Sequence, residues 1–251
     1  SLGTLLGAFF VSSLLSFGLS LVNCSSIVMV LIFALVIFGC KALYSKGKEE
    51  EVESENKAEI EDLSKSSFFH PLVLIIGCMC FIMYSTEGSV MSWSAVFVNQ
   101  ERGVNMEAAG FIYTAFACAM TLMRFLGNRL VSTIGRRKTV VIGSLCVACG
   151  FATTVFIPNV AGSIMGFTLI GLGAANIVPQ LVSFTGHIKG IKVHIAISII
   201  NALGYSGILA GPVIIGFIAD NSSISTAFIC ISIMVLIVAI TCFKIMKKPN
   251  C

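Results

Sequence analysis

The sequence predicts an all-α membrane protein with eight transmembrane helices, and three observations support this fold class. Of the 251 residues, 57% are apolar and only 11% are charged, whereas a soluble domain carries about 25% charged residues. The mean hydropathy is +0.98. Uncharged runs of about 20 residues, the length of a helix that crosses a bilayer, recur along the chain. A membrane barrel is excluded, because its strands alternate apolar and polar residues over about ten positions.

Polar or charged breaks separate the eight expected helices. The helices lie at residues 2–22, 26–43, 71–98, 107–126, 139–157, 161–183, 193–219 and 224–245. The polar residues 23–26 and 158–159 divide stretches that are too long for one span, and Ser222 and Ser223 are suitable N-caps for the last helix. We therefore expect three parts: two helices in 1–44, a charged linker at 45–70 and six helices in 71–251.

The basic residues predict the orientation in the membrane. All but one of the 16 Lys and Arg residues lie in the linker, in alternate loops on one side, or after the last helix, and Arg102 is the exception. Basic loops stay on the cytoplasmic side. We expect the linker and both termini there, with the protein in the plasma membrane, which is the inner membrane if the source is bacterial.

The partners expected from composition are lipids. Residues 45–67 hold eight acidic and four basic side chains, which is typical of a solvated linker. The remainder is basic, which favours contact with the anionic headgroups of the bilayer. No nucleic-acid partner is expected, because basic and aromatic residues do not alternate. Most of the ten Cys residues lie in apolar runs, so we interpret them as packing residues and expect no metal or cofactor.

Several motifs carry a family resemblance. The stretch 124–130 reads RFLGNRL and the stretch 134–138 reads IGRRK. Together they resemble the short GxxxDRxGRR-type loop of the major facilitator superfamily. The helix at 193–219 contains GYSGILAGP at 204–212 and resembles the eleventh helix of the bacterial fucose-permease-like subgroup. Glu87-Gly88 with Trp93, the sequence NIVP at 176–179, and the sequence SLG at 1–3 are similar to the same subgroup.

The resemblance implies a fold and a function. The chain resembles helices 5–12 of a 12-helix major-facilitator-type bundle, and its start at Ser1, without Met, looks like a cut in something longer. The implied activity is secondary active transport of a small polar solute, sugar-like in this subgroup, by alternating access with proton symport, and not an enzymatic reaction. Missing N-terminal helices or a second chain would complete the carrier. The alternative is a truncated, non-transporting scaffold or remnant of such a carrier.

The resemblance also implies a cytoplasmic gate motif. Its residues here are Arg124, Gly127, Asn128, Arg129, Gly135, Arg136 and Arg137. In the family, an Asp at the position of Asn128 pairs with an Arg and latches the inner gate. Asn keeps the hydrogen bonds but loses the charge, so we expect a weaker latch. Arg124 is expected to end the helix at 107–126, either joining this gate or extending to the headgroups.

Glu87 is the leading candidate for chemistry within the membrane. It is the one acidic residue in the interior of an expected span, since Glu107 stands at the start of the span 107–126, and it lies 16 residues, or about 24 Å, from the start of its helix. This distance predicts a position in the outer half of the membrane. Intramembrane carboxyl groups commonly mark ion or substrate pathways, so we expect Glu87 to take up a proton. The alternative is a neutral carboxyl that stabilises a helix break at Glu87-Gly88.

Polar and aromatic residues complete the expected pathway. They are Trp93, Tyr113, Asn176, Gln180, Asn201 and Tyr205. The pairs Asn176 with Gln180 and Asn201 with Tyr205 are four residues apart, so each pair shares a helix face. Their amides suit hydroxylated solutes, or they form hydrogen bonds between helices. Tyr113 is otherwise a core residue, and Trp93 is otherwise an interfacial anchor.

Small residues in the helix at 193–219 have two interpretations. Gly204, Gly207 and Gly211 permit close helix packing. With Pro212 they also permit the bending that alternating access requires.

Overall fold

The chain is described by a computed structural model, and helices form all the regular structure of the described residues. The described residues are 23, 25–31, 33, 34, 36, 70–186, 188 and 192–246. Two units, Ser1–Glu61 and Asp62–Cys251, divide the chain, and each is treated by itself. The expected helix 2–22 and the linker 45–70, apart from His70, lie outside the described residues. The division into the parts 1–44, 45–70 and 71–251 stays a prediction.

In the first unit, the described residues belong to the second expected helix. Asn23 and Ser25 are already helical, as are 26–31, 33, 34 and 36. Three residues of the expected break, Asn23, Ser25 and Ser26, are therefore helical.

In the second unit, six helical spans are long and apolar enough to cross a membrane. Five of them are single helices: α4 (Pro71–Arg102), α5 (Met106–Ile134), α6 (Arg136–Phe156), α9 (Val193–Asn221) and α10 (Ile224–Ile245). The sixth combines α7 (Val160–Ala174) with α8 (Ile177–Thr185). They correspond to the six spans predicted after residue 70. The all-α membrane fold is confirmed.

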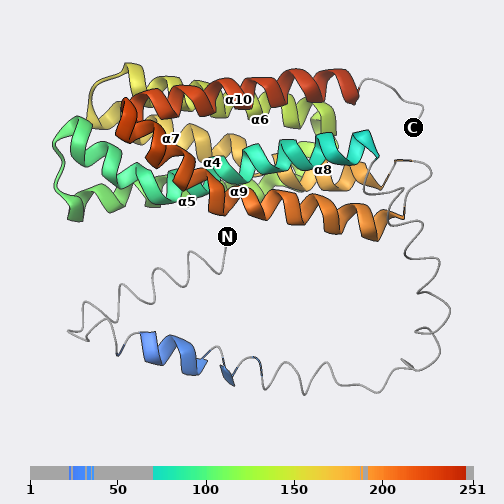
Figure 1. Cartoon of the computed structure of the whole chain (residues 1–251), viewed down its shortest axis with the longest axis horizontal. Helices are drawn as coiled ribbons and strands as arrows, with labels where there is room; N and C mark the ends of the chain where they lie inside the picture. Colours follow the sequence, from blue (N-terminus) through green and yellow to red (C-terminus); the bar gives the residue numbers. More distant parts are fainter. Residues whose placement is uncertain are drawn as a thin grey trace. The chain divides into compact units, whose positions relative to one another are not determined.

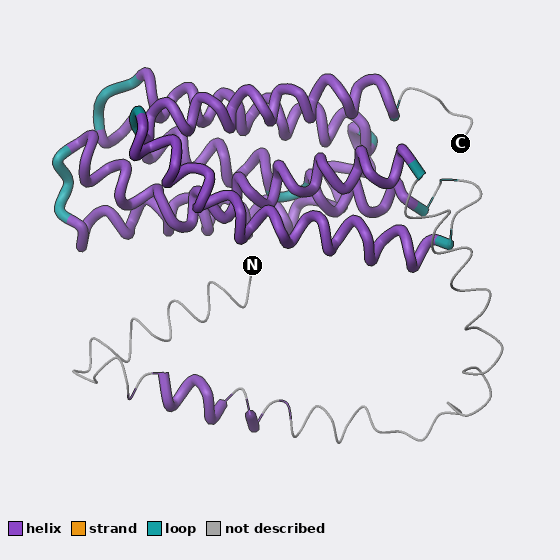
Figure 2. Tube along the Cα trace, viewed as in Figure 1, coloured by secondary structure: helices purple, strands orange, loops and turns teal. Residues whose placement is uncertain are grey.

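Successive spans run in opposite directions, so their connections gather at the two ends of the bundle (Figure 1, Figure 2). The α5–α6 turn, the end of α8 and the end of α10 lie at one end. The α4–α5, α6–α7 and α9–α10 connections lie at the other. This up-and-down order is the one that the alternation of basic and uncharged loops predicted.

The cap residues explain where several helices begin and end. Pro71 starts α4, where its missing N–H costs no hydrogen bond. Gly103 ends α4 in the left-handed conformation at φ 67°, and its N–H donates to the Asn99 carbonyl at 3.1 Å. Asn159 caps α7 by accepting from the Gly162 N–H at 2.6 Å, and Ser223 caps α10 through the Thr226 N–H at 3.0 Å. The break at 158–159 and the Ser223 cap are confirmed.

The expected loop between 126 and 139 is wrong, because helix occupies almost all of it. Helix α5 continues to Ile134, α6 begins at Arg136, and Gly135 alone joins them at φ 83°. Arg124 therefore lies ten residues inside α5 rather than at its end. The hydropathy pattern ended the span at 126, just after the charge of Arg124, but that charge has a partner within the bundle.

The single span expected at 161–183 is present at Val160–Thr185, and within it a turn at Ala175 and Asn176 separates α7 from α8. Pro179 explains the position of the turn. It has no N–H for the carbonyl of Ala175, four residues earlier, and its ring crowds that carbonyl. The helix therefore breaks one turn before the proline.

The core of the second unit forms where small residues let helices approach closely. Added Cβ atoms at Gly204 and Gly211 of α9 would lie 2.7 Å from the Tyr84 ring and from the Ser85 carbonyl of α4, and one at Gly207 would collide with the Phe81 carbonyl. The packing interpretation of this glycine stripe is therefore supported by direct contacts. Elsewhere, four buried rings from α4, α6, α7 and α10 meet. They are Phe97, Phe151, Phe167 and Phe228.

Candidate functional site

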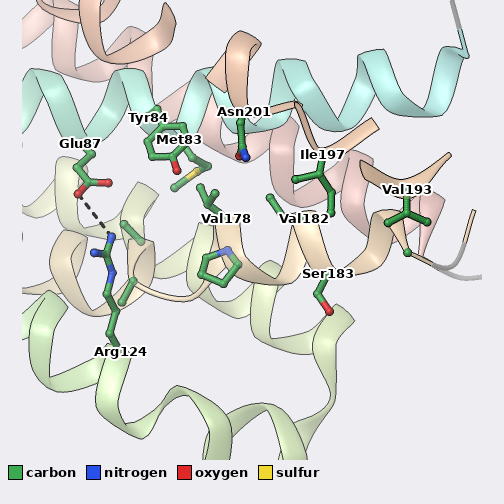
Figure 3. Close-up of a pocket in the computed structure, with 14 residues that line it drawn as sticks. Met83, Tyr84, Glu87, Arg124, Val178, Val182, Ser183, Val193, Ile197 and Asn201 are labelled. Atoms are coloured by element: carbon green, nitrogen blue, oxygen red, sulfur yellow. Dashed lines mark ion pairs between the residues drawn. The ribbon is translucent and has the colours of Figure 1, made fainter. Parts of the chain in front are cut away.

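A cavity of about 580 Å³ opens among α4, α5, α7, α8 and α9 (Figure 3). Its lining combines apolar side chains with one ion pair and a few hydroxyl and amide groups. The lining residues are Met83, Tyr84, Glu87, Arg124, Ala174, Ala175, Val178, Pro179, Val182, Ser183, Gly186, Val193, Ile197 and Asn201. A cavity of this size, mostly apolar with a few converging polar groups, is typical of a small-molecule site.

An ion pair joins two spans at the cavity. Nη2 of Arg124 lies 3.5 Å from Oε1 of Glu87, and each side chain is about one-third exposed, at 34% and 32%. The dashed line in Figure 3 marks this pair. Charged groups inside a membrane bundle are stable when they pair with each other or face an aqueous cavity. Glu87 and Arg124 pair with each other and also line the cavity.

Glu87 lies near the middle of its helix. It is the 17th of the 32 residues of α4, which extends to Arg102, beyond the expected end at 98. Its position in the outer half of the membrane stays a prediction. Helix α4 also continues through Glu87 and Gly88, so the expected break there is absent.

Aromatic rings extend from the ion pair toward α9. Tyr84 precedes Glu87 by three residues and lines the cavity, and its ring stacks on Tyr205 with centroids 5.2 Å apart. Asn201, one turn before Tyr205, also lines the cavity. The predicted face of Asn201 and Tyr205 therefore meets the cavity through Asn201, whereas Tyr205 is 57% exposed and contacts it through Tyr84.

The break between α7 and α8 forms another part of the cavity wall. Ala174, Ala175 and Pro179 all belong to the lining. Because Pro179 cannot donate to the carbonyl of Ala175, a backbone acceptor without its helical partner lies at the cavity. Interrupted helices of this kind commonly border binding sites in transport proteins, since irregular backbone is tolerated in a membrane where it lines a cavity.

Besides Tyr205, four of the predicted pathway residues lie outside the lining. Asn176 is buried, and its Nδ2 donates to the Met123 carbonyl at 2.9 Å, which is the interhelical bond of the alternative interpretation. Nε1 of Trp93 donates to the Pro212 carbonyl at 3.1 Å, so it ties α4 to α9. Tyr113 packs on Phe116.

The fourth, Gln180, is half-buried on α8. Since α8 turns Pro179 and Ser183 toward the cavity, Gln180 lies beside the lining rather than in it.

The predicted gate motif divides into three places. Arg124 lies at the cavity, which contradicts its expected position at the end of a span. Gly127 is buried within α5, where the Asn176 side chain packs directly on it. The remaining residues lie at the end of the bundle near the α5–α6 turn. They are Asn128, Arg129, Gly135, Arg136 and Arg137. A gate role for this last group stays a prediction.

Several cavity residues were missed by the sequence analysis. Met83 and Tyr84 precede Glu87 by four and three residues, and Ile197 precedes Asn201 by four. The helical period that places such residues on one face was the available signal. Ser183 and Val182 had no such signal, because the break before α8 changes the face that the later residues present. Within the described part of the chain, no three His, Cys, Asp or Glu residues are grouped as metal ligands.

Comparison with known proteins places the chain in a family. A family model described as Major Facilitator Superfamily matches residues 1–190 and 90–250. The chain belongs to the major facilitator superfamily. Over 239 residues it is 39% identical to an uncharacterized MFS-type transporter of Yersinia pestis, a match that covers 95% of this chain and 60% of that one. Over 167 residues it is 32% identical to the membrane protein MosC of Rhizobium meliloti, covering 66% and 41%.

A solved structure shares the fold. The crystal structure of the Escherichia coli fucose:proton symporter superposes with a TM-score of 0.74 at 13% identity, covering 96% of this chain and 64% of that one. The predicted family and its fucose-permease-like fold are thus confirmed. This major facilitator chain is an integral membrane protein of a transporter family and not an enzyme. It spans about 60% of the length of its Yersinia relative.

Proposed function

We propose that this major facilitator chain takes part in secondary active transport of a small polar solute by alternating access. The observation that carries the proposal is the Glu87–Arg124 pair, which lies within two spans at a cavity bordered by the α7–α8 break. Pairs of opposite charge inside a membrane bundle commonly belong to ion or substrate pathways. A site near the middle of the bundle suits alternate access from the two sides.

We propose that Glu87 couples transport to protons. As a carboxylate it pairs with Arg124, and when it takes up a proton the pair loses its Coulomb attraction. The Arg124 guanidinium is then available to a solute in the cavity. Solute and proton would bind together in this way, as symport requires.

A sugar-like solute is one proposed class of substrate. Tyr84, Ser183 and Asn201 provide hydroxyl and amide groups in the cavity lining, and the symporter of similar fold carries fucose by its name. A small organic anion is the second class, and the specific observation that favours it is the Arg124 guanidinium in the same lining. Guanidinium groups bind carboxylates through two parallel hydrogen bonds.

The conformational change is proposed to use the α9 residues Gly204, Gly207, Gly211 and Pro212 as bending points. The interior position of Pro212 in α9 supports this role. Asn128, Arg129, Gly135, Arg136 and Arg137 would form the gate at the end of the bundle, on the cytoplasmic side together with the linker and both termini. Further helices or a second chain would complete the cavity wall.

The test measures the external pH when a solute is added to cells that express the native protein, because a rise shows that the solute enters with protons. Fucose and glycolate are the probes of the two substrate classes. We expect one probe to raise the external pH, and Glu87→Gln to abolish that response. Glu101→Gln, which makes the same change at the exposed end of α4, should leave it intact. An undiminished response in Glu87→Gln would refute proton coupling through this residue.

Arg124→Gln separates the two classes of substrate. If the solute is an anion, its uptake should fall far more in Arg124→Gln than in the double variant Glu87→Gln with Arg124→Lys, which retains the positive charge. Uptake of a sugar should depend instead on Asn201→Ala. If neither probe moves protons in any variant, both proposed substrate classes are wrong.

A further inference from the structure

A second cavity, of about 380 Å³, lies where α5, α6 and α10 meet at one end of the bundle. Its lining shares no residue with the cavity around Glu87. One part of the lining is basic and consists of Arg136, Arg137 and Lys138. The other part is apolar and includes Ile142 and Phe243. In Figure 1, the start of α6 and the end of α10 lie at the same end of the bundle.

The basic part of this cavity has little acidic charge near it in the sequence. No Asp or Glu occurs between Glu107 and Asp220, or after Asp220. Asp220 lies at the end of α9, near the connection to α10, which is the opposite end of the bundle. The first turn of α6 holds no acidic residue, and no side chain caps its N–H groups. The positive end of the helix dipole therefore adds to three positive side chains.

Arg137 is held in place by an aromatic ring. Its guanidinium carbon lies 3.9 Å from the centroid of the Phe243 ring, within the range of a cation–π contact. Its Nε is shielded from solvent and has no hydrogen-bond partner among the described residues. The side chain is thus positioned by Phe243, while one of its donors still lacks an acceptor.

The apolar part continues along the outer face of the bundle. Ile142 is 54% exposed and Phe243 is 53% exposed. One turn further from the end of the bundle, Leu145 on α6 and Ile240 on α10 are also exposed. Helices α6 and α10 pack against each other. A basic pocket at a helix end thus leads into an apolar strip of membrane-spanning helix.

We propose that this cavity binds an anionic phospholipid. Arg136, Arg137 and Lys138 hold the headgroup phosphate, and an acyl chain lies along Ile142, Leu145, Ile240 and Phe243. A phosphate diester provides acceptor oxygens and a negative charge that suit guanidinium and ammonium groups. Basic pockets between spans on the cytoplasmic side commonly hold such headgroups. A free phosphate offers the same charge, but it leaves the apolar strip without a partner.

The test is native mass spectrometry of the full chain purified in detergent with added lipid. Phosphatidylglycerol should remain bound, and phosphatidylcholine, which has no net charge, should not. Arg137→Gln should lower the bound fraction of phosphatidylglycerol roughly fivefold, and Arg137→Gln with Lys138→Gln should lower it again by a similar factor. Lys192→Gln, which removes one charge at the start of α9 outside the cavity, should have no effect.

Two additions keep the result interpretable. Arg137→Lys retains the charge and should retain the lipid, so a loss in Arg137→Gln alone is not a folding defect. Inorganic phosphate distinguishes a lipid site from a site for a free anion. The proposal is overturned if phosphate displaces phosphatidylglycerol at equal concentration, or if both lipids bind equally. It is also overturned if Arg137→Gln retains the lipid.

Discussion

Glu87 of α4 and Arg124 of α5 approach each other to 3.5 Å between Oε1 and Nη2, within two membrane-spanning helices. Each charge is acceptable there because the other is present and because both face the cavity. The pair joins two helices that are adjacent in sequence, and it places the proposed proton site and a cationic group for the solute in the same cavity. The first prediction concerns its stability.

Removing one partner of this pair should be more harmful than removing both. Arg124→Gln leaves Glu87 unpaired and should lower the free energy of unfolding by about 1–2 kcal/mol, less than for a fully buried pair because water reaches both groups. Glu87→Gln with Arg124→Gln should recover most of that loss. Thermal unfolding in detergent measures the three variants as a double-mutant cycle. Strictly additive losses would show that the two side chains do not interact.

The glycines of α9 that pack on α4 predict that the destabilisation caused by a Gly→Ala substitution depends on its position. An added Cβ at Gly211 would lie 2.7 Å from the Ser85 carbonyl and 2.8 Å from Ser85 Cα, which are backbone atoms that cannot move aside easily. Gly211→Ala should therefore destabilise the protein by about 1–3 kcal/mol.

Gly110→Ala is the matched control, because a Cβ at Gly110 meets nothing within 4 Å. It should be neutral or stabilising, since Ala favours a helix over Gly by about 0.5–1 kcal/mol. Equal unfolding temperatures for Gly110→Ala and Gly211→Ala would contradict the close approach of α9 to α4.

The contact between Gly127 and Asn176 predicts coupling between α5 and the α7–α8 break. Gly127→Ala would force the Asn176 side chain away, and its hydrogen bond to the Met123 carbonyl would be lost. A hydrogen bond between spans contributes about 0.6 kcal/mol on average. Asn176→Ala should lower the free energy of unfolding by about this much. In the Asn176→Ala background, Gly127→Ala should then cause little further destabilisation. A full penalty for Gly127→Ala in the Asn176→Ala background would show that another atom provides the restraint.

The two glycines with positive φ should differ in their tolerance of asparagine. Gly103 lies in the left-handed region at φ 67° and ψ 20°, which Asn also adopts. Gly135 lies at φ 83° and ψ 155°, a region used almost only by Gly. Gly103→Asn should cost little, whereas Gly135→Asn should cost about 1–3 kcal/mol. The unfolding temperatures of the two variants check this, and the reverse order would refute the turn geometry at Gly135.

Much of the fold follows from the sequence, because hydropathy is a local property. A span must satisfy its own backbone hydrogen bonds in lipid, so an uncharged run of sufficient length predicts a helix without knowledge of its neighbours. The six spans of the second unit, the break before Asn159 and the Ser223 cap were predicted on such local grounds. The same reasoning failed at Arg124, because a charge ends a span only if it lacks a partner.

Four residues of the cavity lining show what the sequence could and could not determine about the site. Glu87 and Asn201 were predicted from residue type and spacing, and both line the cavity. Arg124 was predicted in the wrong place and Tyr84 was not predicted, although it follows the helical period of Glu87.

By itself the sequence determined the class of protein, the six spans after residue 70 and the family. The tertiary structure alone decided that Glu87 meets Arg124, that Asn176 packs on Gly127, and that Arg137 lies over Phe243. The physical reason is that these contacts join different helices, so they depend on how the helices are rotated and how closely they approach. Small residues such as Gly127 and Gly211 set that approach through the packing of whole helix faces, which no local pattern contains.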